Sequence, residues 1–182
     1  MRLFIAVGLP ELHKREILRD TADFADVPSV RVVKPRQMHL TLCFLGERRE
    51  EEIPDIASVV EDACQTFPGF QVSYEGVSAF PDTNRPRVLV VPVFEGVEKL
   101  RELEYFLCSR LTSSDTKKRF VPHITIGRVG RNYPQLRRLL KEPRWQGTPR
   151  GSFGVETIAL YQSVLQPSGA QYTICSERTL RK

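Results

Sequence analysis

The chain has 182 residues, with 27 basic and 22 acidic side chains that give a net charge of +5 at pH 7. This length can bury a substantial core, as one domain or as two closely joined lobes. The apolar stretch at the N-terminus is short and stops at Pro10, so we expect neither a signal peptide nor a membrane span. The four cysteines have no CxxC spacing and are typical of free, mostly buried thiols, which predicts a cytoplasmic protein.

The first part of the chain has a strand, helix, strand pattern. Residues 2–7 form an apolar strand, and the apolar residues between Leu12 and Phe24 indicate a helix after it. A second strand is expected at 39–42. Residues 53–66 then predict a helix, with a proline near its start and apolar residues on one side.

The middle of the chain repeats this pattern after a connecting segment. Alternating apolar residues predict a strand in 69–79, and 80–86 is a turn-rich connector. A strand at 88–93 is followed by a helix with apolar residues at 100, 103, 107 and 111, the spacing of one helix face. Another strand is expected at 123–126.

The last part of the chain is expected to end in a hairpin. Residues 130–151 predict a short helix between loops, and 152–165 predict one strand. A turn at 166–169 leads to a hairpin partner at 170–176. Helices mixed with antiparallel hairpins favour an α+β fold over a doubly wound parallel sheet.

The two halves of the chain are related by one offset of 84 residues. Phe4 precedes His39 by 35 residues, and Val88 precedes His123 by 35. We therefore predict one domain over residues 1–182, with a bilobal α+β fold. Its two pseudo-symmetric strand-helix-strand lobes would have antiparallel sheets that line a central groove.

Two of the three histidines begin the same short motif, HLTL at 39–42 and HITI at 123–126. Side chains alternate between the faces of a strand, so each histidine shares a face with the threonine two positions later. Each motif's apolar residues face the core. One such motif alone is typical of a structural histidine, but its repetition favours a reaction site that contains His39, Thr41, His123 and Thr125. His13 has no such partner and is expected at the surface.

Paired histidines and threonines suit a displacement at phosphorus. Imidazole takes and gives protons near neutral pH, so one neutral and one protonated ring can serve the attacking and leaving oxygens. Threonine hydroxyls can donate hydrogen bonds to the non-bridging oxygens. A strained cyclic phosphodiester would be a suitable substrate. The cysteines and histidines lack metal-ligand spacing and HExxH is absent, so we expect neither a metal ion nor any other cofactor.

Short basic runs are a weaker sign of a polyanionic partner. Such runs are usually solvated surface, but beside a phosphate site they indicate attraction to nucleic acid. No zinc finger, Walker loop or RNP motif is present. The runs are Arg48-Arg49, Lys117-Lys118-Arg119, Arg128 with Arg131, and Arg137-Arg138.

Several ordered segments together resemble a known family. They are RLFIAVGLP, the HLTL motif with FLG after it, RPRVLVVPV, FVPHITIGR and LYQSVLQPSGAQYT. The chain is similar over nearly its whole length to the bacterial and archaeal RNA 2',3'-cyclic phosphodiesterases, the 2'-5' RNA ligase-like family of the two-histidine phosphoesterases. The resemblance implies a bilobal α+β fold with the two motifs facing each other. It also implies metal-independent hydrolysis of 2',3'-cyclic phosphates, on RNA or on nucleotides, to 2'-phosphomonoesters.

The resemblance also implies roles for individual residues. His123 would be the base that activates water, and His39 the acid that protonates the leaving 3' oxygen, although the sequence leaves the reverse assignment open. Thr41 and Thr125 would bind phosphate. Arg128 matches an arginine that commonly follows the second motif. Strict alternation would point it away from His123, so either a bulge near Gly127 or a strand end must re-aim it.

Other roles and functions stay open at this point. Phe44, Phe80 and Tyr161 could stack a base or pack in the core. The protein could be a non-catalytic RNA- or nucleotide-binding module, or could mainly join RNA ends through a 2'-5' linkage. We expect RNA with 2',3'-cyclic phosphate ends or cyclic nucleotides as partners, no membrane association, and a monomer.

Overall fold

The computed structural model describes residues 1–112, 120–166 and 169–182. Strands and helices are mixed along the chain, as the sequence predicts. The strands are β1 (Arg2–Gly8), β2 (Val30–Val32), β3 (His39–Glu47), β4 (Phe70–Glu75), β5 (Ser78–Phe80), β6 (Val88–Glu95), β7 (His123–Val129), β8 (Arg150–Val155), β9 (Thr157–Gln166) and β10 (Gly169–Thr179).

The ten strands in the described residues form one antiparallel sheet, which confirms the predicted α+β class. Eight of them lie in the order β10-β9-β1-β3-β7-β6-β4-β8, while β2 pairs with β7 and β5 pairs with β6. Strands β3 and β7 meet at the centre, where Leu40 faces Ile124. β1 and β6 therefore occupy matching places on either side of the centre, as do β9 and β4.

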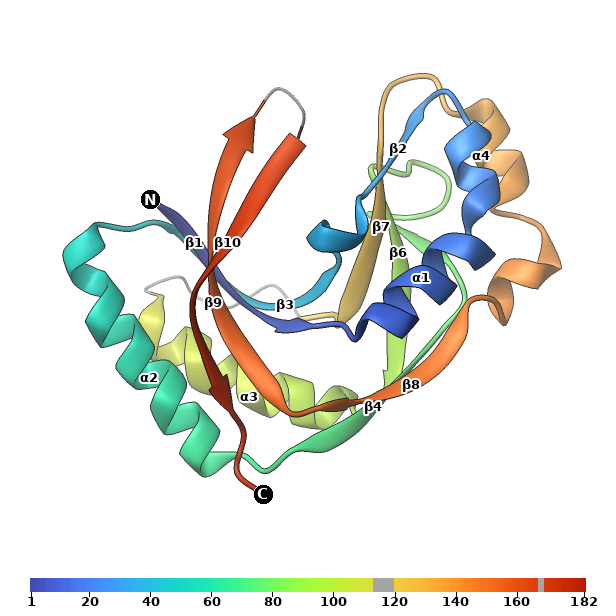
Figure 1. The fold of residues 1–182 in the computed structure, drawn as a ribbon. Coiled ribbons are helices and arrows are strands. Elements are labelled where there is room, and N and C mark those ends of the chain that lie inside the picture. Colours follow the sequence, from blue (N-terminus) through green and yellow to red (C-terminus); the bar gives the residue numbers. More distant parts are fainter. Residues whose placement is uncertain (113–119, 167–168) are drawn as a thin grey trace.

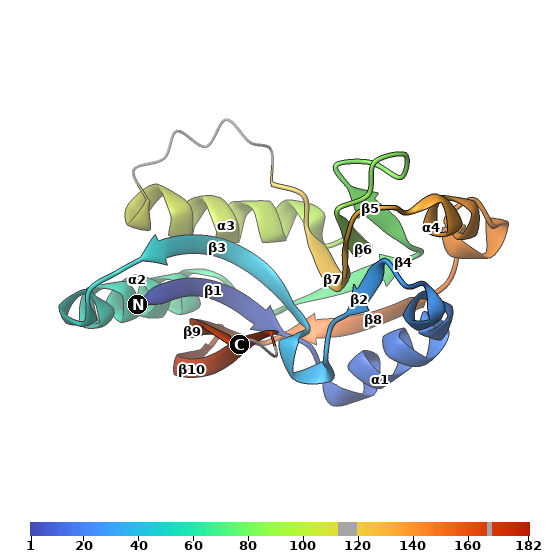
Figure 2. The same cartoon turned by 90° about the horizontal axis from the view of Figure 1, so that it is seen from above.

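The helices lie beside the sheet in two groups (Figure 1). They are α1 (Glu11–Asp20), α2 (Ile53–Thr66), α3 (Val97–Leu111) and α4 (Pro134–Leu139), with 3-10 turns η1 (Ala22–Asp26), η2 (Pro35–Gln37), η3 (Glu50–Glu52) and η4 (Pro143–Gln146). α2 and α3 contact each other, with α3 against β3 and α2 against β9 and β10. α1 lies at the other end, near β8 (Figure 2). No helix among the described residues is long and apolar enough to cross a membrane.

Each half of the chain supplies a helix that packs on strands of the other half. α3 follows β6 in the chain, yet it packs on β3. α1 follows β1, yet the ring of its His13 lies 5.5 Å from that of Phe153 in β8 and 5.7 Å from that of Tyr74 in β4. The two strand-helix-strand units are therefore interleaved.

The apolar pattern of α3 and β1 explains how the core is built. Leu100, Leu103 and Leu107 are fully buried along one face of α3. In β1, every residue from 3 to 7 is buried, because Leu3, Ile5 and Val7 lie in the hydrophobic core on one face, while on the other face Phe4 packs against the rings of Tyr161 and Tyr172. A continuous apolar run is typical of a strand that is covered on both faces.

Two segments that are predicted as single strands are each two strands. Residues 69–79 contain β4 and β5, separated by a turn at Gly76, which has a positive φ of 75°. A Cβ atom there would lie 2.6 Å from the carbonyl oxygen of Trp145, so the turn requires glycine. Residues 152–165 contain β8, next to β4, and β9, next to β1. The chain crosses from one end of the sheet to the other between them.

The cysteines and His13 differ from the sequence prediction. Cys43 and Cys108 form a disulfide with a Cα–Cα distance of 5.9 Å, whereas Cys64 and Cys175 are free. The prediction of four free thiols is therefore wrong for one pair. His13 is not a surface residue, since its side chain is 15% exposed and its Nδ1 lies 2.9 Å from the Tyr74 hydroxyl.

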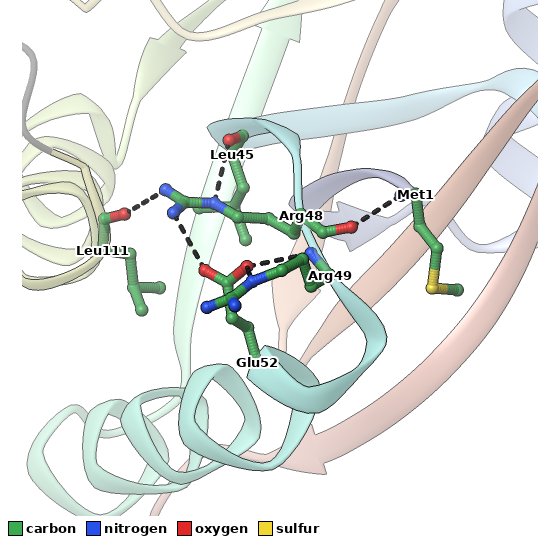
Figure 3. Close-up of polar contacts among 6 residues, drawn as sticks. All are labelled: Met1, Leu45, Arg48, Arg49, Glu52 and Leu111. Carbon is green, nitrogen blue, oxygen red and sulfur yellow. Dashed lines mark hydrogen bonds and ion pairs between the residues drawn. The ribbon is translucent and has the colours of Figure 1, made fainter.

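Arg48 holds three segments together, so the first basic run is structural (Figure 3). Its guanidinium donates to the carbonyl of Leu45 at 3.1 Å, to the carboxylate of Glu52 at 3.3 Å, and to the carbonyl of Leu111 at 2.6 Å. The last bond places a cation at the C-terminus of α3, where the helix dipole favours it. Arg49 pairs with the same carboxylate at 3.4 Å. The run at 117–119, like part of the turn at 166–169, lies outside the described residues.

Candidate functional site

A pocket of about 830 Å³ brings the two predicted motifs together. Its walls come from β1, β2, β3, β7, β9 and β10, with single residues from β5 and β6, and include His39, Thr41, His123 and Thr125. The other lining residues fall into three kinds. They are the cations Arg2, Arg31, Lys34 and Arg128, the aromatic residues Phe4, Phe44, Phe80 and Tyr172, and small, apolar or neutral polar residues of the same strands and loops.

The pairing of β3 with β7 explains why the two motifs meet. Leu40 and Ile124 face each other and are fully buried, so the neighbouring residues point to the opposite face of the sheet. In an antiparallel pair the two chains run in opposite directions. Continuing the register by one residue in each direction therefore sets His39 beside Thr125 and Thr41 beside His123.

Both strands carry a bulge at the same place after the motif. In β7, Thr125 pairs with Val90 and Gly127 with Leu89, which leaves Ile126 without a partner in β6. As a result Arg128 returns to the face of His123, and of the two expected causes, a bulge near Gly127 or a strand end, the structure has the bulge.

In β3, Thr41 pairs with Ala6 and Cys43 with Ile5, which leaves Leu42 without a partner in β1. Phe44 is thereby turned to the pocket wall, where it is 73% exposed. Phe44 and Arg128 thus occupy equivalent positions of the two halves, each five residues after a histidine.

His39 lies among aromatic rings that bury it. Its ring centroid is 4.8 Å from that of Phe4, 5.2 Å from that of Tyr172 and 6.1 Å from that of Tyr161. The pKa of His39 is lowered to about 4, mainly by burial and in smaller part by positive charge on His123, Arg128 and Lys14, whereas a hydrogen bond to the backbone of Gln37 raises it.

His123 is oriented by its own strand. Its Nδ1 lies 2.8 Å from the carbonyl oxygen of Val121, and the edge of its ring packs against Phe80 at 4.8 Å between centroids. The carbonyl accepts the Nδ1–H, which leaves the Nε2 lone pair available. Burial lowers the pKa of His123, and Arg128 lowers it further, whereas the bond to Val121 raises it.

The aromatic residues that the sequence suggests for base stacking lie in different places. Phe44 and Phe80 line the pocket, the second of them against His123. Tyr161 stacks on Phe4 with ring centroids 5.0 Å apart and an interplanar angle of 8°, and it does not line the pocket. It lies behind His39, whose ring is nearly parallel to it.

Sequence reasoning missed other pocket residues. Arg31 and Lys34 lie in and just after the short strand β2, and Tyr172 lies in the hairpin strand β10. The alternation of valine with arginine in residues 30–32 is the one local signal that could have indicated β2. Gln37 donates to the carbonyl of Ala170 at 2.7 Å and so ties the η2 turn to the hairpin.

The pocket is electropositive. The described residues that line it include two arginines, Arg31 and Arg128, that have no carboxylate partner, and none of the lining residues is an aspartate or a glutamate. Such a pocket attracts anions. Within the described part of the chain, no group of three or more His, Cys, Asp or Glu side chains is placed to hold a metal ion.

Comparison with known proteins places this architecture in a class. A crystal structure of a Thermus thermophilus protein superposes with a TM-score of 0.80 at 30% identity, over 100% of this chain and 98% of that one. A crystal structure of E. coli LigT complexed with phosphate gives a TM-score of 0.78 at 26% identity, with the same coverage. The fold is therefore the LigT-like α+β fold.

The family follows from the sequence matches. The family model described as the 2'-5' RNA ligase superfamily matches residues 18–166. An RNA 2',3'-cyclic phosphodiesterase of Archaeoglobus fulgidus is 33% identical over 174 residues, which cover 94% of this chain and 96% of that protein. One from Thermus thermophilus is 33% identical over 193 residues, which cover 100% and 91%. The chain belongs to the 2'-5' RNA ligase superfamily and, within it, to the RNA 2',3'-cyclic phosphodiesterase family.

Proposed function

We propose that this protein hydrolyses 2',3'-cyclic phosphate ends of RNA, or of nucleotides, to 2'-phosphomonoesters. Water attacks the phosphorus, the bond from phosphorus to the 3' oxygen breaks, and the 3' oxygen leaves as a hydroxyl. His123 takes the proton from water, and His39 gives a proton to the 3' oxygen. No metal ion takes part. The pocket is the cleft between the two lobes, each of which supplies one His-Thr pair.

The orientation of His123 supports its role as the base. Its Nδ1–H is held by the carbonyl of Val121, so its Nε2 is the acceptor that a water molecule can reach. Burial keeps the ring neutral, since it lowers the pKa below its ordinary value. A base must be neutral before it acts.

His39 becomes an acid only when the substrate is bound. Its pKa of about 4 in the empty pocket means that the ring is neutral at pH 7. A phosphate carries a negative charge, and an opposite charge nearby favours the protonated imidazole. Substrate binding therefore raises the pKa of His39 and prepares the proton for the 3' oxygen.

The remaining pocket residues hold the substrate in place. The hydroxyls of Thr41 and Thr125 donate hydrogen bonds to the non-bridging oxygens, where negative charge is concentrated during the transfer. Arg128 lines the same pocket as both histidines, and we assign it to the same phosphate. Phe44 offers an exposed ring on which a base can stack.

The main support for the proposal is that Leu40 of β3 pairs with Ile124 of β7. This pairing sets each histidine beside the threonine of the other motif. It favours a reaction over simple RNA binding, because binding needs cations and stacking more than two neutral imidazoles. LigT from E. coli has been crystallised with phosphate, which is consistent with an anion pocket in a protein of this fold.

The test is turnover of 2',3'-cyclic AMP, with 2'-AMP measured by chromatography. His39→Ala and His123→Ala are each expected to lower kcat at least about 100-fold, the usual contribution of general acid-base catalysis. His13→Gln is the matched control, because this third histidine lies outside the pocket. Circular dichroism checks that the variants are folded.

Three results would change the interpretation. Near wild-type turnover in either alanine variant would refute the two-histidine mechanism. Tight RNA binding without any product in the wild-type protein would favour the binding-module alternative. Joining of RNA ends through a 2'-5' linkage, at a rate above that of hydrolysis, would favour ligation as the main role.

A further inference from the structure

A cluster of cations lies along the pocket wall that β2 and β7 form. Arg31 of β2 faces Arg128 of β7 in the antiparallel register, and both line the pocket with Lys34, which follows β2. Facing residues in an antiparallel pair have Cβ atoms about 4.5–5.5 Å apart, and like charges at that position are destabilising. The empty protein therefore carries an electrostatic cost at this wall.

No carboxylate offsets that cost among the residues that the structure describes. Each of the three cations lacks an ion pair there, and the pocket has no acidic lining residue. Some other surface cations have acidic partners, as where the guanidinium of Arg178 donates to Glu61 at 2.7 Å. Cations that face one another without a partner indicate that an anion from outside the chain binds between them.

The cluster lies further along the same strand as the two histidines. Near its start, β7 pairs with β3, where the two motifs meet. From residue 127 to residue 129, β2 lies beside β7 instead. Arg128 still acts on both imidazoles, whereas Arg31 lies one strand further out. A chain whose last phosphate is at the histidines can therefore continue past Arg128 to Arg31.

We propose that Arg31, with Lys34 beside it, binds the internal phosphate that precedes the cyclic end of an RNA chain. The inference rests on the proposed function and names its substrate class. A cyclic mononucleotide places its only phosphate at the histidines and leaves the repulsion at Arg31 in place. An oligonucleotide supplies a second phosphate there and relieves it. The preferred substrate is an RNA chain with at least one internal phosphate.

The experiment compares two substrates in wild-type protein and in Arg31→Gln. One substrate is 2',3'-cyclic AMP, and the other is a short oligoribonucleotide with a 2',3'-cyclic phosphate end. Arg36→Gln is the matched control, because this exposed arginine lies in η2 near the same wall but does not line the pocket. Both substitutions remove one positive charge. The kcat/KM values are measured at several salt concentrations.

Arg31→Gln is expected to lower kcat/KM for the oligonucleotide about tenfold, which is what one charge-assisted hydrogen bond contributes. Its effect on 2',3'-cyclic AMP should stay below about twofold, and Arg36→Gln should change neither value. The salt dependence for the oligonucleotide should weaken as well. The slope of log kcat/KM against log salt concentration should become shallower by about 0.7, the change expected for one lost phosphate contact.

The possible failures are distinguishable. If Arg31→Gln leaves the oligonucleotide value unchanged, or lowers both substrates equally, the inference is wrong while the proposed function stands. If the wild-type protein turns over neither substrate, the proposed function is wrong, and the inference falls with it.

Discussion

The low pKa of His39 makes the stability of the protein depend on pH in a defined way. The native pKa is about 4, and the ordinary value in an unfolded chain is about 6.5. Between these values the unfolded chain takes up a proton on His39 and the native protein does not. The stabilisation is therefore complete above about pH 6.5, and it is lost as the pH falls toward 4.

The size of the effect follows from the two pKa values. Lowering the pH from 7.5 to 4.5 should reduce the free energy of unfolding by about 2.5 kcal/mol through His39 alone. Other groups also respond to pH, and the lowered pKa of His123 acts in the same direction. A comparison with His39→Gln separates these contributions, because the variant keeps the other groups and lacks the buried imidazole.

The assay is urea unfolding followed by circular dichroism, at pH 7.5 and at pH 4.5, in buffer without phosphate. Phosphate is left out because an anion in the pocket would raise the pKa of His39. The wild-type protein is expected to lose about 2–3 kcal/mol more than the variant between the two pH values. Equal losses in the two proteins would refute the claim that His39 is buried in its neutral form.

Three other predictions concern the pocket and the Arg48 contacts. Thr41→Val and Thr125→Val should each lower kcat by about 10- to 100-fold with little change in KM, because the hydroxyls act on charge that develops in the transition state; an effect on KM alone in steady-state kinetics would contradict this. Arg48→Met should lower the free energy of unfolding by about 1–3 kcal/mol, since a half-buried carboxylate and a helix-end carbonyl lose their donor. Arg49 is exposed, so Arg49→Met should lower the free energy of unfolding by less than about 0.5 kcal/mol. Equal urea midpoints for the Arg48→Met and Arg49→Met variants would contradict the contacts of Figure 3. Turnover should be unchanged after dialysis against EDTA, and strict dependence on an added metal would contradict the proposed mechanism.

Those parts of the fold that depend on local pattern could be predicted from the sequence. The helix expected over 53–66 is α2, with the same bounds, and the apolar spacing from 100 to 111 lies in α3. Both tetrads begin a strand and point their apolar residues inward, because a period of two decides which face a side chain takes. The repetition of the motif was enough to place both histidines in one pocket.

Those parts that depend on long-range pairing could not be predicted. Residues 152–165 have apolar residues spread along their length, including Val155, Ile158 and Leu160, yet they divide into β8 and β9 at opposite sides of the sheet, because an apolar pattern does not specify which strand pairs with which. Arg31 enters the pocket only because β2 pairs with β7, about a hundred residues later in the chain. The disulfide joins cysteines separated by 65 residues, and no spacing rule connects them.

The exchange of helices between the two halves has a consequence for how the chain can be divided. The core of each half is completed by the other, because α3 packs on β3 of the first half, while Tyr74 and Phe153 pack against His13 of α1. A cut between the two halves would leave the apolar face of α3 without β3, and β4 and β8 without α1.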